Sequence, residues 1–356
     1  MTKSRTKRLL AKLVCIMSVT FLLCGCQGQV QENPETEVTE DDQIQIGMSF
    51  DSFVIERWQK DRDVFVSTAK ELGAEVNVQN ANGDINTQIS QIRYLISKKM
   101  DVIVIICIDS EGLSDVIHEA REEGIKVIAY DRLVKNSDVD LYISFDNTKV
   151  GYLMGEGIAS LNLPNKKVLM LTGPTADNNV SMVEEGFREV CEENGIEIVD
   201  VMYADGWKAE LAADYLYEHP QVLENIDAIM CGNDNIATTV VRVLAEKRLA
   251  GKIPVVGQDA DLEACQHIME GTQIMTVYKP VERLAQASAQ YAVKLAKHER
   301  LSDVNQTISD GSYDVPYYVI DPIAVNKDNM DDVIILSGFH LKEDVYLNVP
   351  DKERNQ

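Results

Sequence analysis

The sequence predicts an α/β protein made of two lobes of similar topology, each built on a mainly parallel sheet. Short β-branched runs alternate with helical stretches along most of the chain, which is typical of parallel strands covered by helices on both faces. Segments of the first half recur in the second half. The 356 residues also exceed the size that a single hydrophobic core usually reaches. Together these features favour two lobes over one long sheet.

The N-terminus carries the features of an export signal over residues 1–25. An apolar run from Leu13 to Leu23 is too short for a good transmembrane helix, and it follows five cations: Lys3, Arg5, Lys7, Arg8 and Lys12. It ends in LCGC, which resembles a bacterial lipobox, so we expect cleavage before Cys26 and diacylation of that cysteine. An uncleaved anchor and a soluble export signal are the alternatives. Residues 26–43 are acidic and almost free of large apolar side chains, which predicts a disordered tether.

The folded body is expected to begin near Ile44 with a strand and to alternate from there. Its first half contains the predicted strands IQIGMS, AEVNVQ, VIVII and KVIAY. Helices are predicted from Arg57 to Leu72, from Ile85 to Lys99 and again between VIVII and KVIAY.

The second half repeats this order with the predicted strands KVLML, EIVDVMY, DAIMC and IPVVG. The run GIKVIAYD, which ends at Asp131, recurs as GKIPVVGQD, which ends at Asp259. After Lys279 we expect a helix over about Val281 to Lys297 and strands at VPYYVI and DVIIL. These extra elements predict that the chain passes between the lobes more than once.

Polar side chains cluster directly after the predicted strands, where ligands of open α/β sheets bind. Carboxylates and amides beside cations can satisfy the donors and acceptors of vicinal hydroxyls, and tryptophan rings can cover the C–H faces of a pyranose. A single aspartate after a strand is more often a helix cap, which is what we expect of Asp234 and Asp261. The candidate sugar-binding residues are Arg57, Trp58, Asp131, Arg132, Asp177, Asn179, Trp207, Asn233, Asp259 and Lys279.

Segments around these residues resemble the D-xylose-binding proteins of ABC transporters, within the type I periplasmic binding proteins. The resemblance runs from about Ile44 to His340, and its most specific parts are GQDAD and GTQIMTVYKP; IERWQKDRD, KVIAYDRL, DNN and DGW also match. It implies that the same ten residues line the sugar site. Two features depart from the family pattern: the lipobox with its tether, and the pair Cys231-Gly232 before Asn233.

The resemblance further implies two Rossmann-like lobes joined by three hinge strands, with hinges near residues 146–147, 279–280 and 315–316. The N-terminal lobe is then expected over 44–146 plus 281–315, and the C-terminal lobe over 147–280 plus 316–356. The implied function is capture of D-xylose and its delivery to an ABC permease. Together with the lipobox, this predicts a monomer anchored by lipid to the extracytoplasmic face of the cell membrane. A sugar sensor that signals to a membrane histidine kinase or a chemoreceptor is the alternative, and the sequence does not decide between these outputs.

Other function classes find little support in the sequence. A formal net charge of −24 disfavours nucleic-acid binding, and the acidic tether stands where a sugar-responsive repressor needs a basic DNA-binding domain. No GxSxG, HExxH or P-loop motif is present, and no cofactor or metal site is expected. A glycosidase using paired carboxylates is disfavoured because Arg132 and Lys279 should keep Asp131 and Asp259 ionised. The four cysteines of the body are expected to be buried thiols: Cys107, Cys191, Cys231 and Cys265.

Overall fold

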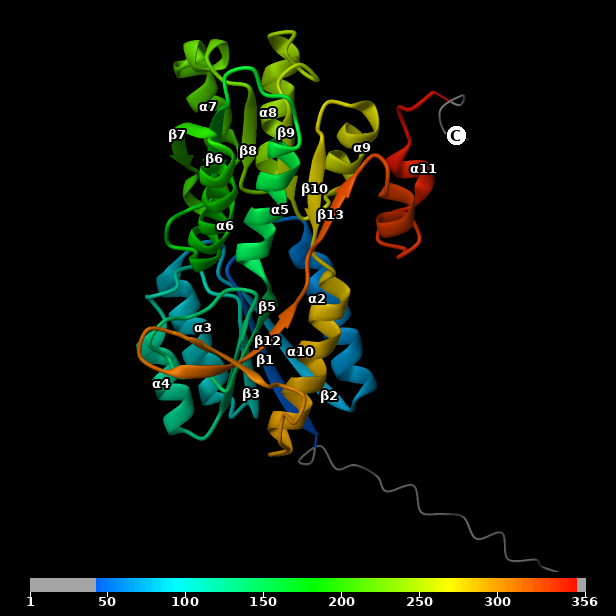
Figure 1. Cartoon of the computed structure of the whole chain (residues 1–356). Helices are drawn as coiled ribbons and strands as arrows, with labels where there is room; N and C mark the ends of the chain where they lie inside the picture. Colours follow the sequence, from blue (N-terminus) through cyan, green and yellow to red (C-terminus); the bar gives the residue numbers. More distant parts are fainter. Residues whose placement is uncertain (1–42, 351–356) are drawn as a thin grey trace, which may run out of the picture. The chain divides into compact units, whose positions relative to one another are not determined.

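The computed structural model describes residues 43–350, which fall in one unit of the chain (Figure 1). The expected export signal, Cys26 and nearly all of the expected tether lie outside the described residues. Two sheets, one in each lobe, organise this unit, so the predicted α/β class is confirmed.

The sheet of the first lobe has the strand order β11-β12-β5-β4-β3-β1-β2, parallel except for the β11–β12 pair. Its interior strand β3 (Val102–Ile105) is apolar throughout because both of its faces are buried: Val102 and Val104 enter one core cluster, whereas Ile103 and Ile105 enter another. The other strands are β1 (Ile44–Phe50), β2 (Ala74–Asn80), β4 (Lys126–Tyr130), β5 (Leu141–Phe145), β11 (Gln306–Ser309) and β12 (Asp314–Ile320).

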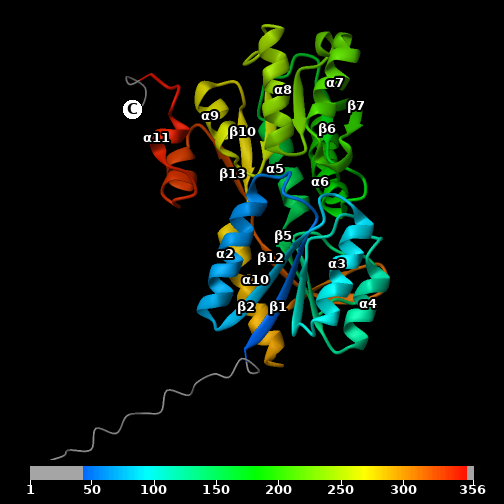
Figure 2. The ribbon, with the colours of Figure 1, turned by 180° about the vertical axis from the view of Figure 1, so that it is seen from behind.

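Helices cover both faces of this sheet (Figure 2). The helices α2 (Arg57–Glu71) and α10 (Val281–Ala296) pack together on one face, although the length of most of the chain separates them. On the other face lie α3 (Ile85–Ser97) and α4 (Ser114–Glu122).

The second lobe has the strand order β13-β10-β9-β8-β6-β7, with only the β10–β13 pair antiparallel. Its strands are β6 (Lys167–Thr172), β7 (Glu197–Tyr203), β8 (Ala228–Cys231), β9 (Val255–Gln258), β10 (Met275–Tyr278) and β13 (Ile323–Asn326). Its helices are α5 (Asn147–Ala159), α6 (Asn178–Asn194), α7 (Glu210–Glu218), α8 (Asp234–Glu246) and α9 (Leu262–Glu270). Short 3-10 turns cover Asp205–Trp207 and Pro220–Glu224.

Backbone contact between α5 and α6 fixes the helical layer of the second lobe. A Cβ added at Gly151 would lie 1.8 Å from the Val183 carbonyl oxygen, and one added at Gly186 would lie 1.9 Å from the Thr148 carbonyl oxygen. Only glycine permits so close an approach, and this approach holds the N-terminus of α6, with its site residues, close to α5.

The chain passes between the lobes at three places: between Phe145 and Asn147, between Tyr278 and Val281, and between Ile320 and Ile323. The third place differs from the expected boundary at residues 315–316. That boundary lies inside β12, which pairs with β5 from Tyr317 to Ile320 and therefore stays in the first sheet. Within β12, Pro316 lies opposite Thr307 of the edge strand β11.

The chain after β13 differs from its prediction as well. The run DVIIL was expected to be a strand, but Asp331–Ile335 forms a π-helical turn, and α11 (Lys342–Val345) follows it and packs on α9. Only Ile334 of this turn is fully buried, and Leu336 is 78% exposed, so the run has no apolar face of period two to bury. Among residues 43–350, no helix is long and apolar enough to cross a membrane.

Candidate functional site

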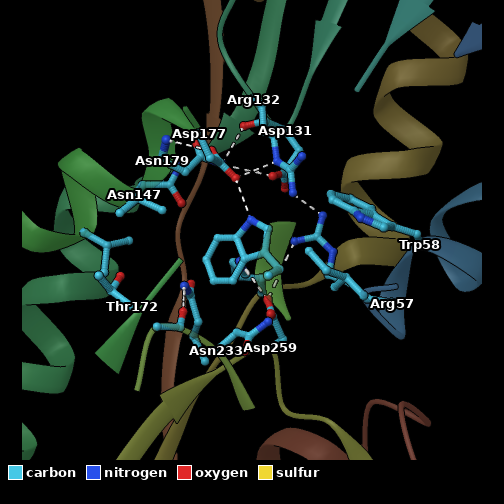
Figure 3. A pocket seen from close by; sticks show the side chains of 17 residues that line it. Arg57, Trp58, Asp131, Arg132, Asn147, Thr172, Asp177, Asn179, Asn233 and Asp259 are labelled. Atoms are coloured by element: carbon cyan, nitrogen blue, oxygen red, sulfur yellow. Dashed lines mark hydrogen bonds and ion pairs between the residues drawn. The ribbon is translucent and has the colours of Figure 1, made fainter. Parts of the chain in front are cut away.

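One pocket between the lobes is lined by all ten residues that the sequence singled out (Figure 3). They come from both lobes, and each follows the end of a strand, because the strands of each lobe end at the edge that faces the other lobe. The first lobe contributes Arg57, Trp58, Asp131 and Arg132, and the second contributes Asp177, Asn179, Trp207, Asn233, Asp259 and Lys279.

Arg57 is the centre of a buried charge network on the first lobe. Its Nη2 atom lies 2.6 Å from Asp131 Oδ2 and 3.2 Å from Asp61 Oδ1, and Asp61 also accepts a hydrogen bond from the Tyr130 hydroxyl. The guanidinium stacks 4.4 Å from the centre of the Trp58 ring. Burial acts to raise the pKa of Asp131, but the charges of Arg57 and Lys279 outweigh burial and lower that pKa. Asp131 is therefore ionised at neutral pH.

Arg132 connects the two lobes directly. Its Nη1 atom donates to Asp51 Oδ2 at 2.8 Å and to the Cys107 carbonyl at 2.9 Å, both in the first lobe. Its Nε atom lies 2.7 Å from Asp177 Oδ2 of the second lobe. Burial acts to lower the pKa of Arg132, and the charges of Asp177 and Asp51 outweigh it, so the guanidinium stays protonated.

Asp177 and Asn179 hold the start of α6 against the first lobe. Asp177 is the N-cap residue and accepts a hydrogen bond from the Asn179 backbone amide at 3.0 Å. It also accepts one from the Trp207 indole at 3.1 Å. The Asn179 side-chain amide donates across the cleft to Asp131, at 3.1 Å to its carbonyl and 3.0 Å to its Oδ1.

The indole of Trp207 is aimed into the pocket by a strained turn. Trp207 has φ +59°, a left-handed conformation that is rare for so large a side chain, and Gly206 before it has φ +61°. A Cβ added at Gly173 would lie 2.4 Å from the Trp207 ring, so the ring packs flat on that glycine.

The carboxylate of Asp259 completes the network from the second lobe. Its Oδ1 atom lies 2.7 Å from Lys279 Nζ and 3.8 Å from Arg57 Nη1, which belongs to the other lobe. Asp259 has φ +101° and Ala260 has φ +56°, while Asp131, its counterpart in the sequence repeat, has φ +64°. Matched positions of the two halves thus hold strained backbone where their carboxylates enter the pocket.

Asn233, not Asp234, is the N-cap of α8, because its side chain accepts a hydrogen bond from the Ile236 amide at 3.0 Å. The expectation that Asp234 is a cap is therefore wrong. Its carboxylate is fully buried and accepts hydrogen bonds from Gln273 at 2.9 Å and from Thr276 at 2.6 Å. Burial raises its pKa to about 7. Asp261 does occupy the N-cap position of α9, but its side chain makes no capping hydrogen bond.

Several polar atoms of the pocket have no hydrogen-bond partner among the described residues, although they are buried. They are the indole Nε1 of Trp58, Oδ1 of Asn179, Oε1 of Gln258 and Oδ1 of Asp259, the last of which forms an ion pair with Lys279. The cavity measures only about 20 Å³, because ion pairs and side chains from both lobes meet across it. A buried polar atom without a partner costs free energy unless a ligand or water satisfies it. These polar atoms therefore suit a ligand with several hydroxyls, which needs more room than the cavity has in this conformation.

Gln258 is one of seven pocket residues that were missing from the ten; the others are Ile55, Asn147, Thr172, Val180, Val183 and Gly232. Thr172 and Gln258 are the last residues of β6 and β9, so the strand-end rule could have found both. The apolar members carry no signal in the sequence, since valine and isoleucine line cores far more often than pockets.

No cysteine is among the residues that line this pocket. All four of the described cysteines are free and buried. Burial raises the pKa of each thiol, so none is a reactive thiolate at neutral pH. Among residues 43–350, no group of three or more potential ligands is arranged to hold a metal ion.

Comparison with known proteins identifies relatives over most of the chain. The sequence model described as "Periplasmic binding protein domain" matches residues 46–300. The D-xylose-binding periplasmic protein of Haemophilus influenzae is 43% identical over 308 residues, which covers 85% of this chain and 92% of that protein. The protein of the same description from Escherichia coli is 40% identical over 330 residues, covering 91% and 98%. A crystal structure of an ABC transporter solute-binding protein from Clostridium phytofermentans with bound β-D-glucose has a TM-score of 0.77 at 27% identity, covering 85% of this chain and 99% of that one.

Proposed function

The chain belongs to the periplasmic binding protein family, and from this premise we propose that it captures D-xylose between its lobes and delivers it to an ABC permease. Its fold is the type I periplasmic binding protein fold, and membership in a family of binding proteins agrees with the expectation that it is not an enzyme. The observation that carries the proposal is the pocket itself, where side chains from both lobes converge and leave polar atoms without partners.

A sugar fits the chemistry of these atoms. Trp58 Nε1 can only donate a hydrogen bond, while Asn179 Oδ1 and Gln258 Oε1 can only accept. Hydroxyl groups do both, so a ring carrying several of them can meet donors and acceptors at once. Arg57 and Arg132 add planar donor groups that can span two neighbouring hydroxyls. The choice of D-xylose rests on the two relatives that are 40% and 43% identical.

Binding would work through closure of the lobes. The three passages between the lobes are short, and each joins the end of one element to the start of another, as hinges do. Only when the lobes approach can Arg57, Asp131 and Asp259 contact one ligand together. A sugar that contacts both lobes therefore favours the closed state over the open one.

The proposed location at the membrane rests on the sequence of the N-terminus. An export signal and a lipid on Cys26 would hold the protein at the extracytoplasmic face of the membrane, where a permease can receive the closed form. No observation favours the sensor alternative. A Cys26→Ser variant expressed in a bacterium should move from the membrane fraction to the soluble fraction; equal membrane retention would argue against the lipid anchor.

The proposal is tested by titrating the soluble body, the chain from Ile44 onward without the export signal and the tether, with sugars. Isothermal titration with D-xylose should give one site per chain, and the melting temperature should rise with D-xylose concentration. The added stability should reach about 2.7 kcal/mol at one hundred times Kd. D-glucose, D-ribose, L-arabinose and myo-inositol serve as comparison ligands. A stronger response to one of them would change the sugar, and no response to any would refute sugar binding.

A further inference from the structure

After β13 the chain packs beside α9 of the second lobe; we call residues 327–350 the C-terminal segment (Figure 2). The segment is firmly packed, since Ile334 and Val345 are at most 1% exposed. Two side-chain hydrogen bonds tie it to α9: Gln266 donates to the Asp344 carbonyl at 2.8 Å, and Asn348 donates to Glu270 at 2.6 Å. Packing on α9 alone would give the segment a purely structural role.

Two adjacent residues of the segment, Phe339 and His340, reach beyond α9 and contact the residues next to Asp259 and Lys279 of the pocket. The Nε2 atom of His340 lies 2.8 Å from the carbonyl oxygen of Ala260, the residue that follows Asp259. Because a carbonyl can only accept, Nε2 carries the proton and donates. Burial lowers the pKa of His340, so the imidazole is neutral at neutral pH and holds its single proton on Nε2.

The loop that contains Asp259 and Ala260 depends on contacts from other segments to keep its conformation. Asp259 and Ala260 both have left-handed backbone, which persists only where surrounding contacts hold it. The Ala260 amide donates to Thr276 Oγ1 at 3.1 Å, so Thr276 binds the amide and His340 binds the carbonyl of the same residue. The only other partner of the Ala260 carbonyl among the described residues is the weak thiol donor Cys265, at 3.5 Å.

Phe339 links the same site to the hinge and to the first lobe. Its ring lies 4.8 Å from that of Tyr278, the last residue of β10 before the second passage. Lys60 of α2 approaches from the first lobe, with Nζ 3.3 Å from the Phe339 carbonyl and 4.1 Å from its ring centre. Lys60 also pairs with Glu282 at 2.7 Å. The dipeptide Phe339-His340 therefore touches both lobes and the loop that carries Asp259.

We propose that His340 is a positioning residue for Asp259, through which the C-terminal segment sets the affinity of the pocket for its sugar. The hydrogen bond to the Ala260 carbonyl fixes the orientation of the peptide group between Ala260 and Asp261, and through the adjoining backbone the direction of the Asp259 carboxylate toward Lys279 and Arg57. The hydrogen bond from Lys60 to the Phe339 carbonyl connects the first lobe to the dipeptide Phe339-His340 when the lobes are closed. This inference rests on the proposed function, because it needs a sugar whose affinity can be measured.

The test compares three variants of the soluble body by isothermal titration with D-xylose and by calorimetric melting without sugar. His340→Ala should weaken affinity about tenfold, the equivalent of one lost hydrogen bond. His340→Gln should restore most of it, because the glutamine amide can donate to the same carbonyl. Gln266→Ala is the matched control: it removes a comparable tie between the segment and α9 without touching the loop, so it should lower the melting temperature and leave affinity unchanged.

His340→Phe keeps the ring volume without the donor and should lose affinity as His340→Ala does, so it replaces that variant should the alanine protein not fold. Wild-type affinity in a folded His340→Ala or His340→Phe protein would overturn the proposal. An equal loss of affinity in Gln266→Ala would also overturn it, since the segment would then act only through general stability. Failure of the wild-type protein to bind any sugar would instead refute the proposed function.

Discussion

Replacing Asp259 with asparagine should weaken sugar binding by removing the charge that joins Lys279 to Arg57 across the lobes. Arg57 keeps two other carboxylate partners after this change, Asp61 and Asp131. Lys279 makes no second ion pair among the described residues, and its side chain is only 7% exposed. The substitution therefore leaves a buried ammonium group without its counter-ion in the closed protein.

The size of the effect follows from the burial of the pair. Removing one partner of a buried ion pair costs about 3–5 kcal/mol, because the remaining charge stays desolvated. The charge of Lys279 also acts on Asp131, which compensates part of that cost. We therefore expect a value near the lower end, about 3 kcal/mol, or roughly a hundredfold in affinity. In an open protein water reaches Lys279, so the cost falls on closure and is measured as weaker binding.

Isothermal titration with D-xylose measures the affinity, and small-angle scattering measures how far saturating sugar closes the lobes. The matched control is Asp261→Asn, which changes a carboxyl group two residues away that does not line the pocket and makes no capping hydrogen bond to its helix. We expect near wild-type affinity in that control. Wild-type affinity in Asp259→Asn, or an equal loss in Asp261→Asn, would refute the reasoning.

Two further substitutions probe one hydrogen bond and one structural carboxylate. Trp58→Phe keeps an aromatic ring but removes an indole N–H that has no partner among the described residues. Titration should therefore show about tenfold weaker binding, with little change in melting temperature. Unchanged affinity would mean that this N–H does not contact the sugar. Asp310 accepts four backbone hydrogen bonds at 2.8–2.9 Å. Burial acts to raise its pKa, but these bonds outweigh burial and lower it, so its stabilising effect is present above the unfolded pKa and is lost as pH falls through the folded one. Asp310→Asn should thus lower the free energy of unfolding by about 2 kcal/mol at pH 7 in urea titrations, with a deficit that shrinks below about pH 4; a deficit that does not change with pH would contradict this account.

The strand ends explain why the sequence could locate the pocket. Parallel strands finish at one edge, so residues that follow them, such as Asp131 and Asp259, meet without any knowledge of distant contacts. The partners of these residues were beyond prediction, because the bond from Asn179 to Asp131 depends on the angle between the lobes. The role of Asp234 depends on Thr276, which a long stretch of chain separates from it.

The balance of charge in the pocket explains how a network of ion pairs can receive a sugar. Three cations, Arg57, Arg132 and Lys279, face three carboxylates, Asp131, Asp177 and Asp259. A neutral polyhydroxylated ring can enter between such partners, because its hydroxyls donate to the carboxylates and accept from the cations without adding charge. A sugar acid or a sugar phosphate would bring a negative charge with no free cation to pair it, and burying an unpaired charge is costly. The same pairs that close the lobes therefore select a neutral sugar over a charged one.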